Sequence, residues 1–418
     1  MNNPNFSNIN RRQFLKYSAL ASATGILSTG AHSELTRQAI AQNFGRPKKM
    51  VVVLLRGALD GLNTVVPFRD SNYYIARPTI AIPGPGKAGG AINLDNEFGL
   101  HPAMADLMPF WKSRQLAFVH ASGSPDPTRS HFDAQDYMET GTPGKKGTSS
   151  GWMNRMLQYL PQRSSTVAVN LGSTTPRILS GPIATSNVQA NKKGLPKLAI
   201  DNEPVQSVFD QLYQGNDIIA SVYKEGRRSR QLLKQGLNRE MMDSAKGAPT
   251  PDYLSKNVNN VVKLLTGPTQ TNLMFMSLGG WDTHVNQGDS EGQLAKRLTP
   301  LSRGLSLLAK SLGRTFDDTV IVVMSEFGRT VRENGNRGTD HGHGNVMMVL
   351  GGQVAGGQVY GDWRGLQNDN LHAGRDLPVT TDFRDVLAPL LNRHYQMGNT
   401  EIAQIFPGYR PQNLIRLL

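Results

Sequence analysis

The sequence predicts an α/β fold built on a mostly parallel central sheet. Three segments rich in apolar and β-branched residues, 50–55, 272–278 and 319–324, have the composition of strands that are buried on both faces of such a sheet. Segments with helical periodicity alternate with the strands, as the crossovers of a parallel sheet require. We therefore expect one large α/β domain.

The remaining elements follow in chain order. A helical pattern over residues 102–113 leads into a strand at 115–120, and residues 291–312 form a long helix that leads directly into the strand at 319–324. Residues 382–391 form the last substantial core helix. The other predicted elements are helices at 130–140 and 152–159, a short strand at 167–171, and a helical middle section at 206–213, 217–242 and 252–265.

The first 41 residues have the pattern of a twin-arginine signal peptide. NRRQFLK at 10–16 contains the paired arginines, residues 17–31 are modestly apolar, and Ala39-Ile40-Ala41 is a small-x-small cleavage site. A basic amphipathic surface helix is the alternative interpretation. We expect the twin-arginine translocase to export the chain, so that a mature domain at 42–418 lies in the periplasm or is secreted.

Charge and composition restrict the partners. The formal net charge is +13 and stays near +10 without the leader, which favours anionic small molecules, sulfated or acidic polysaccharides, or lipid headgroups. No zinc finger or helix-turn-helix pattern points to nucleic acid. No apolar stretch is long enough to predict a transmembrane segment. The chain has no cysteine, so it has neither disulfides nor thiolate metal ligands.

Carboxylates and imidazoles follow the three buried strands. These side chains are Asp60 after the first strand, Asp282 and His284 after the second, and Glu326, Asp340, His341 and His343 after the third. Ligand sites of open α/β sheets lie beyond the carboxyl ends of the strands. Oxygen and nitrogen ligands of this kind suit zinc, manganese or calcium. The pattern therefore predicts a divalent-metal site, although an aspartate such as Asp60 is also typical of a helix or turn cap.

A candidate nucleophile lies in the string PDPTRSHFDAQDY at 125–137. Ser130 falls at the start of a predicted helix, where free backbone amides and the helix dipole favour an ionised hydroxyl. His131 and Asp133 then become supporting or substrate-binding groups. A serine at this position is more often simply a helix N-cap.

The chain resembles a known family in several specific strings. LRGALDGLNTVVPF, RSHFDAQDYMETG, GWMNR, GGWDTH, MSEFGRT, GTDHGHGN and TTDFRDVL, together with the twin-arginine leader, are similar to the secreted bacterial family called domain of unknown function 1501. That family is distantly similar to the alkaline phosphatase superfamily, which includes sulfatases. The resemblance implies a three-layer, alkaline-phosphatase-like α/β/α sandwich with one or two divalent ions and a serine or threonine nucleophile.

The resemblance also implies roles for individual residues. Asp60 resembles the superfamily's first-strand metal ligand, and Ser130 its nucleophile. Asp282 and His284 resemble the pair that holds the first ion, and His341 or His343 the late histidine ligand.

Two departures concern the metal site. Glu326 stands in the place of the aspartate in the superfamily's Asp-His-Gly string, but Phe327 replaces the histidine of that string. Asp282 and His284 are separated by one residue, where the superfamily has a longer gap. These departures imply one ion only, a rebuilt site that uses His131 or Asp340, or the loss of catalysis.

Two functions remain open from the sequence. The first is an exported metal-dependent hydrolase that cleaves a phosphate or sulfate ester of an anionic small molecule or polysaccharide with Ser130 as nucleophile. The second is a non-catalytic binding or assembly protein of the cell envelope with a degenerate site.

Overall fold

The computed structural model describes residues 46–161, 164–188, 203–215, 217–228, 253–269, 271–412 and 414–418. The predicted signal peptide and its cleavage site lie outside these residues, as does the second half of the helix expected at 217–242. Residues Lys48–Leu418 form one compact unit.

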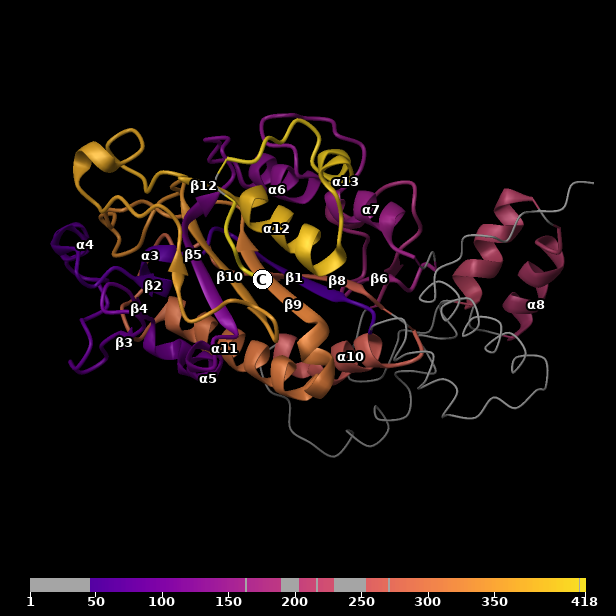
Figure 1. Cartoon of the computed structure of the whole chain (residues 1–418), viewed down its shortest axis with the longest axis horizontal. Coiled ribbons are helices and arrows are strands. Elements are labelled where there is room, and N and C mark those ends of the chain that lie inside the picture. Colours follow the sequence, from indigo (N-terminus) through magenta and orange to yellow (C-terminus); the bar gives the residue numbers. More distant parts are fainter. Residues whose placement is uncertain are drawn as a thin grey trace, which may run out of the picture. The chain divides into compact units, whose positions relative to one another are not determined.

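A mixed, mostly parallel sheet forms the centre of this unit (Figure 1). In the described part of the chain its strand order is β11-β5-β10-β9-β1-β8-β6-β7, and β12 pairs with β5. Among the strands of this sheet in the described residues, only β10 is antiparallel, to both β5 and β9. The strands are β1 Lys49–Arg56, β5 Leu116–Gly123, β6 Ala168–Asn170, β7 Ser186–Asn187, β8 Leu273–Gly279, β9 Thr319–Ser325, β10 Asn345–Gly351, β11 Val359–Tyr360 and β12 Thr381–Asp382. The predicted fold class is confirmed.

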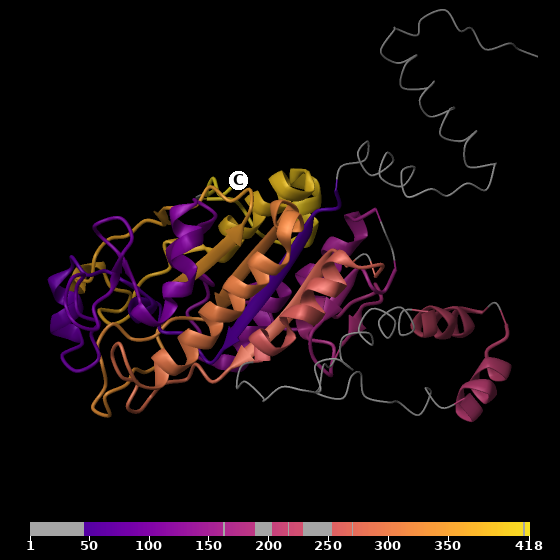
Figure 2. The same cartoon turned by 90° about the horizontal axis from the view of Figure 1, so that it is seen from below.

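Helices cover both faces of the sheet, which gives three layers (Figure 1). One face carries η1 Pro102–Leu107, α5 Met108–Lys112, α10 Tyr253–Thr266 and α11 Gln293–Ser311. Figure 2 shows α10 and α11 side by side across this face. The other face carries α6 His131–Thr140, α7 Trp152–Met156, α12 Phe383–Tyr395 and α13 Asn399–Ile405.

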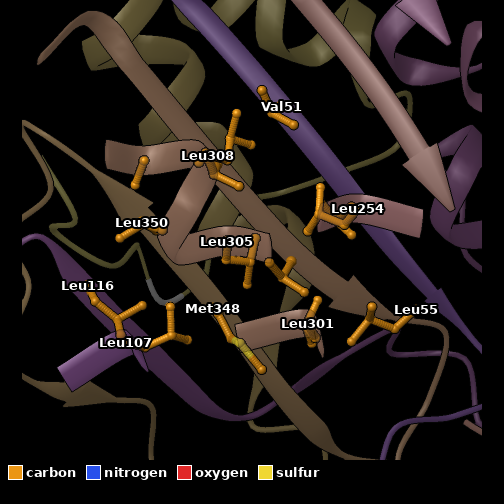
Figure 3. Close-up of a cluster of buried hydrophobic side chains, with 14 of the residues drawn as sticks. Val51, Leu55, Leu107, Leu116, Leu254, Leu301, Leu305, Leu308, Met348 and Leu350 are labelled. Carbon is orange, nitrogen blue, oxygen red and sulfur yellow. The ribbon is translucent and has the colours of Figure 1, made fainter. Parts of the chain in front are cut away.

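Alternation along β1 divides the core between the two faces. Successive side chains of a strand point to opposite faces, so Val51 and Leu55 pack with Leu305 of α11 (Figure 3), whereas Val52 packs with Leu387 of α12 on the other face. Each fully buried leucine contributes about 1.5–3 kcal/mol relative to an exposed one. Because both faces of the sheet are covered, residues that point to either face are apolar, and the sequences of these strands are continuous apolar runs.

The smaller elements lie around this frame. Among the described residues they are α3 Gly61–Thr64, α4 Ser71–Ala76, the helix α8 Glu203–Leu212, the short helices η2 Leu157–Tyr159, η3 Arg177–Leu179, η6 Gly313–Asp318 and η7 Asn368–Asn370, and a separate sheet of β2 Val65–Val66, β3 Ile92–Asn93 and β4 Gly99–Leu100. No helix in these residues is long and apolar enough to cross a membrane.

The structure corrects the predicted element order in three places. The run NVMMVLG, not assigned from the sequence, forms β10 in the middle of the sheet. The helix expected at 102–113 is divided into 3₁₀ and α segments. α13 follows the helix that was expected to be the last in the core, and it buries Ile402 and Ile405.

Three parallel strands position the candidate site. β8, β1 and β9 are neighbours, and in register Leu55 lies opposite both Leu278 and Ser325. Their carboxyl ends therefore meet at one edge of the sheet, and the loops that follow them bring Asp60, Asp282 and Glu326 to that edge.

Candidate metal centre

Two histidines and an aspartate converge on one point at this edge. One ligand atom from each of His131, Asp282 and His341 lies within 4.8 Å of the other two. The Nε2 atoms of His131 and His341 are 3.0 Å apart, and Nε2 of His341 is 3.2 Å from Oδ1 of Asp282. The loop after β8, the loop after β9 and the first turn of α6 thus bring together groups that are far apart in sequence.

A third imidazole adjoins this group. Nε2 of His284 lies 3.1 Å from Nε2 of His341 and 2.9 Å from Oδ1 of Asp282. The side chains of His131, Asp282, His284 and His341 are 24–42% exposed, so solvent reaches the cluster. We call these four residues the His/Asp cluster.

The Nδ1 atoms of the three imidazoles face oxygen atoms. Each ring has Nδ1 against an oxygen acceptor: Glu326 Oε1 at 2.7 Å for His131, Asp340 Oδ1 at 3.3 Å for His284, and the main-chain oxygen of Arg129 at 3.1 Å for His341. A neutral imidazole that donates from Nδ1 presents a lone pair at Nε2. Lone pairs that face each other at about 3 Å repel, and a cation between them removes the repulsion. Histidines oriented in this way are typical of metal ligands.

Glu326 supports the cluster from a fully buried position behind His131. Its carboxylate accepts hydrogen bonds from His131, from Gln135 Nε2 at 2.9 Å and from the main-chain nitrogen of Gly57 at 2.8 Å. Burial alone would raise the pKa of Glu326, but these hydrogen bonds outweigh it and hold the pKa below its usual value. The hydrogen bond to Glu326 in turn raises the pKa of His131. A more basic imidazole donates its Nε2 lone pair more strongly to a metal ion.

Arg329 holds Asp282 in place. The buried guanidinium donates to Oδ1 of Asp282 at 2.5 Å and to the main-chain oxygen of Ala58 at 2.9 Å. Burial opposes ionisation of Asp282, but the charge of Arg329 and its hydrogen bond lower the pKa of Asp282 overall. Asp282 is therefore a fixed carboxylate between an arginine and the imidazoles.

Sequence reasoning missed Arg329 and Gln135, although both had a signal. Arg329 belongs to the quoted string MSEFGRT. Gln135 follows His131 by four positions, so the two lie on one face of α6.

Four of the predicted ligands lie outside the cluster, and two of these, Asp60 and His343, do not contact it. Asp60 is fully buried, pairs with Arg77 at 2.6 Å, accepts from Gln287 at 2.7 Å and caps α3 through Asn63. Asp60 therefore has the capping role that was its alternative. His343 is buried against His372, with ring centroids 4.8 Å apart, and burial lowers the pKa of His343 to about 4.

The other two predicted ligands outside the cluster contact its imidazoles. Glu326 and Asp340 contact the cluster through the Nδ1 atoms of His131 and His284. His131, expected beside a catalytic serine, is itself in the cluster.

Ser130 and Phe327 flank the cluster. Ser130 is exposed and caps α6, where its hydroxyl accepts from the main-chain nitrogen of Asp133 at 3.4 Å. The Phe327 ring packs against His131 and His341, with centroid distances of 4.9 and 5.2 Å. An apolar ring thus occupies the place where the superfamily string has a histidine.

The fold and the site define an α/β protein with a mostly parallel sheet and a histidine/aspartate cluster at the carboxyl ends of its strands. Residues 47–406 match the family described as "Protein of unknown function (DUF1501)". The chain belongs to this family, as its sequence strings indicated. No curated protein matches the sequence.

Several solved structures are similar to this chain. The C-terminal periplasmic domain of EcEptC from Escherichia coli, in complex with Zn, is 11% identical over 74% of each chain with a TM-score of 0.36. The PsFucS1 sulfatase from Pseudoalteromonas sp. is 11% identical over 86% of this chain and 71% of that chain (TM-score 0.35). A protein in the alkaline phosphatase superfamily from Vibrio parahaemolyticus is 12% identical over 76% and 63% (TM-score 0.33).

Proposed function

We propose that this protein is an exported metal-dependent hydrolase of phosphate or sulfate esters. The observation that supports the proposal most is the convergence of three Nε2 atoms on the carboxylate of Asp282, with every Nδ1 against an oxygen acceptor. A purely structural cluster needs no such orientation. The partial exposure of all four side chains leaves the site open to a substrate.

The donor set favours one zinc or manganese ion. Three imidazoles and a carboxylate suit zinc, whereas calcium prefers an all-oxygen shell of six to eight ligands. Phe327 supplies no donor atom, which supports a single ion instead of two. When bound, such an ion acts as a Lewis acid on an ester oxygen.

Ser130 is the proposed nucleophile. Its exposed hydroxyl precedes the cluster residue His131 directly and lies at the N-terminus of α6, where the helix dipole favours negative charge. The Oγ atom would bond to phosphorus or sulfur as the bond to the ester oxygen breaks and the alcohol leaves. Water would then cleave the serine ester and release the inorganic anion.

Three substitutions separate the nucleophile from the cap. Ser130→Ala removes both roles, Ser130→Asn keeps a good N-cap without a hydroxyl, and Ser130→Thr keeps both. We expect Ala and Asn to abolish turnover of aryl phosphates and sulfates with zinc or manganese added, and Thr to retain part of it. Only the Ala variant should lose about 0.5–2 kcal/mol of stability. Turnover that survives in the Asn variant would remove Ser130 from the mechanism.

A non-catalytic envelope protein is the second candidate function. The capping role of Ser130 and the apolar Phe327 beside the cluster favour it. A wild-type protein that holds its metal but cleaves none of a broad panel of esters would support this candidate over the hydrolase.

Export by the twin-arginine translocase belongs to the same proposal. The paired arginines at positions 11 and 12 and the cleavage site after Ala41 support it. The protein would then meet its substrate in the periplasm or outside the cell.

A further inference from the structure

A cavity of about 740 Å³ opens beside the His/Asp cluster. It lies at the carboxyl ends of β1, β6 and β8, and residues from those ends, Arg56, Leu171 and Gly279, line it. Crevices beyond the carboxyl ends of strands are the usual ligand sites of α/β sheets. This volume falls in the range of small-molecule pockets.

The cavity adjoins the cluster in two ways. Trp281 lines the cavity and is followed directly by the cluster residue Asp282. Arg56 donates to Gln135, Gln135 donates to Glu326, and Glu326 accepts from His131. A molecule in the cavity therefore touches both the loop that holds Asp282 and the chain of hydrogen bonds that orients His131.

The lining is basic and contains no acidic side chain among the described residues. Arg56 is neutralised by Glu139 at 2.7 Å. Arg297, on α11, has only a hydrogen bond to the main-chain oxygen of Gln293 at 2.9 Å, and no carboxylate in the described part of the chain pairs with it. Arg297 is thus a half-buried cation that is open to an anionic ligand.

The rest of the lining combines aromatic and aliphatic surface with hydroxyls. Tyr253 is 37% exposed, Trp281 is buried, and Leu254 and Leu301 belong to the buried cluster of Figure 3. Ser277 adds an exposed hydroxyl. Apolar walls with a few polar groups are typical of pockets that bind organic ligands.

We propose that this cavity binds the alcohol portion of the ester, and that this portion carries a second anionic group recognised by Arg297. The inference rests on the proposed hydrolase function, because it places the scissile ester at the His/Asp cluster. It makes the substrate an organic anion with a ring or chain that packs on Tyr253 and Leu254, instead of a small neutral ester.

Calorimetric titration with naphthalene sulfonate tests the pocket without any turnover. The carbon–sulfur bond of this probe is not an ester, and naphthol is its uncharged counterpart. Wild type should bind the sulfonate at least tenfold more tightly than naphthol. Arg297→Gln should weaken sulfonate binding at least tenfold and leave naphthol binding unchanged, whereas Arg297→Lys should retain part of the preference. Arg303→Gln, an exposed arginine on the same helix outside the cavity, is the matched control and should bind like wild type.

Metal content separates this inference from the proposed function. Arg297→Gln should keep its metal, and His341→Ala should lose metal but still bind the sulfonate. A wild-type protein that contains no metal but binds the sulfonate through Arg297 would refute the proposed hydrolase function and still support the ligand-binding pocket. Equal binding of sulfonate and naphthol, no sulfonate binding, or an Arg297→Gln variant that binds like wild type would overturn the inference.

Discussion

The orientation of single imidazoles is the feature that distinguishes this site from an ordinary polar surface. His131, His284 and His341 each direct Nδ1 to an oxygen, and Nε2 of His341 lies about 3 Å from Nε2 of both His131 and His284. Acceptors of this kind fix the tautomer of a histidine ligand and raise its basicity. We therefore expect substitutions behind the cluster, as well as within it, to change the affinity for the proposed ion.

Replacing Glu326 tests this effect. Glu326→Gln keeps the shape of the side chain but removes the charge that raises the pKa of His131, so we expect metal affinity to fall about 10- to 100-fold. Competition with a chelating dye measures the change. Glu333→Gln is the control. Glu333 accepts hydrogen bonds from the main-chain nitrogens of Thr79 and Ile80, which do not belong to the cluster. Equal affinity in wild type and Glu326→Gln would show that Glu326 does not support the site.

At the scale of elements, the positions of most strands could be predicted from the sequence, but the pairing of the strands in the sheet could not. The runs that form β1, β8 and β9 are apolar because both faces of the sheet are covered. β10 carries the same signal, but it follows the polar loop 338–344 and runs antiparallel, which alternation of strand and helix does not anticipate. Strand pairing depends on contacts between distant segments, and a local pattern does not record them.

The sequence predicted which loops lie near the site, but not which side chains of those loops contact one another. Strand ends placed Asp282, His284 and His341 correctly at one edge, because parallel strands share that edge. Which loop side chains meet depends on loop conformation. Asp60 forms a buried ion pair with Arg77 outside the cluster, and the N-terminus of α6 brings His131 into the cluster instead.

A buried histidine on β5 should make stability depend on pH. His120 is fully buried, lies 3.0 Å from the main-chain oxygen of Val65 through Nε2, and accepts from the main-chain nitrogen of Ala121 through Nδ1. Burial lowers the pKa of His120 to about 4, below its ordinary value of 6.5. Between pH 6.5 and about pH 4, His120 is protonated in the unfolded chain but neutral in the folded protein. The free energy of unfolding therefore falls as the pH falls through this range.

The expected loss is about 2 kcal/mol between about pH 7 and about pH 5. Urea unfolding at the two pH values measures it, and His120→Gln, which does not titrate, shows how much comes from other groups. If the free energy of unfolding of the variant falls as steeply as that of wild type, His120 does not titrate as we expect.

For the whole molecule, the proposed export route is compatible with the proposed metal centre. Twin-arginine export carries folded proteins, so an ion held by three distant segments of the chain could bind before transport. Replacing Arg11 and Arg12 together by Lys should leave the precursor in the cytoplasm, as fractionation and immunoblotting would show. Efficient export of that variant, or a mature N-terminus far from Gln42, would contradict the predicted leader.

Metal binding should also stabilise the fold as a whole. The cluster joins α6 to the loops after β8 and β9, so an ion that binds only the folded protein adds to its stability. Removal of the ion by a chelator should lower Tm by several degrees, and zinc should restore it. Arg303→Gln should respond like wild type, whereas a Tm that is unchanged after verified metal removal would exclude a structural contribution from the ion.

Elemental analysis of the exported protein tests the metal centre most directly. Protein recovered from the periplasm without chelators should contain about one zinc or manganese ion per chain. Asp282→Ala and His341→Ala should reduce this content strongly, whereas Asp60→Asn, outside the cluster, should not. A wild-type protein that contains no divalent ion and takes up neither zinc nor manganese on dialysis would contradict the account.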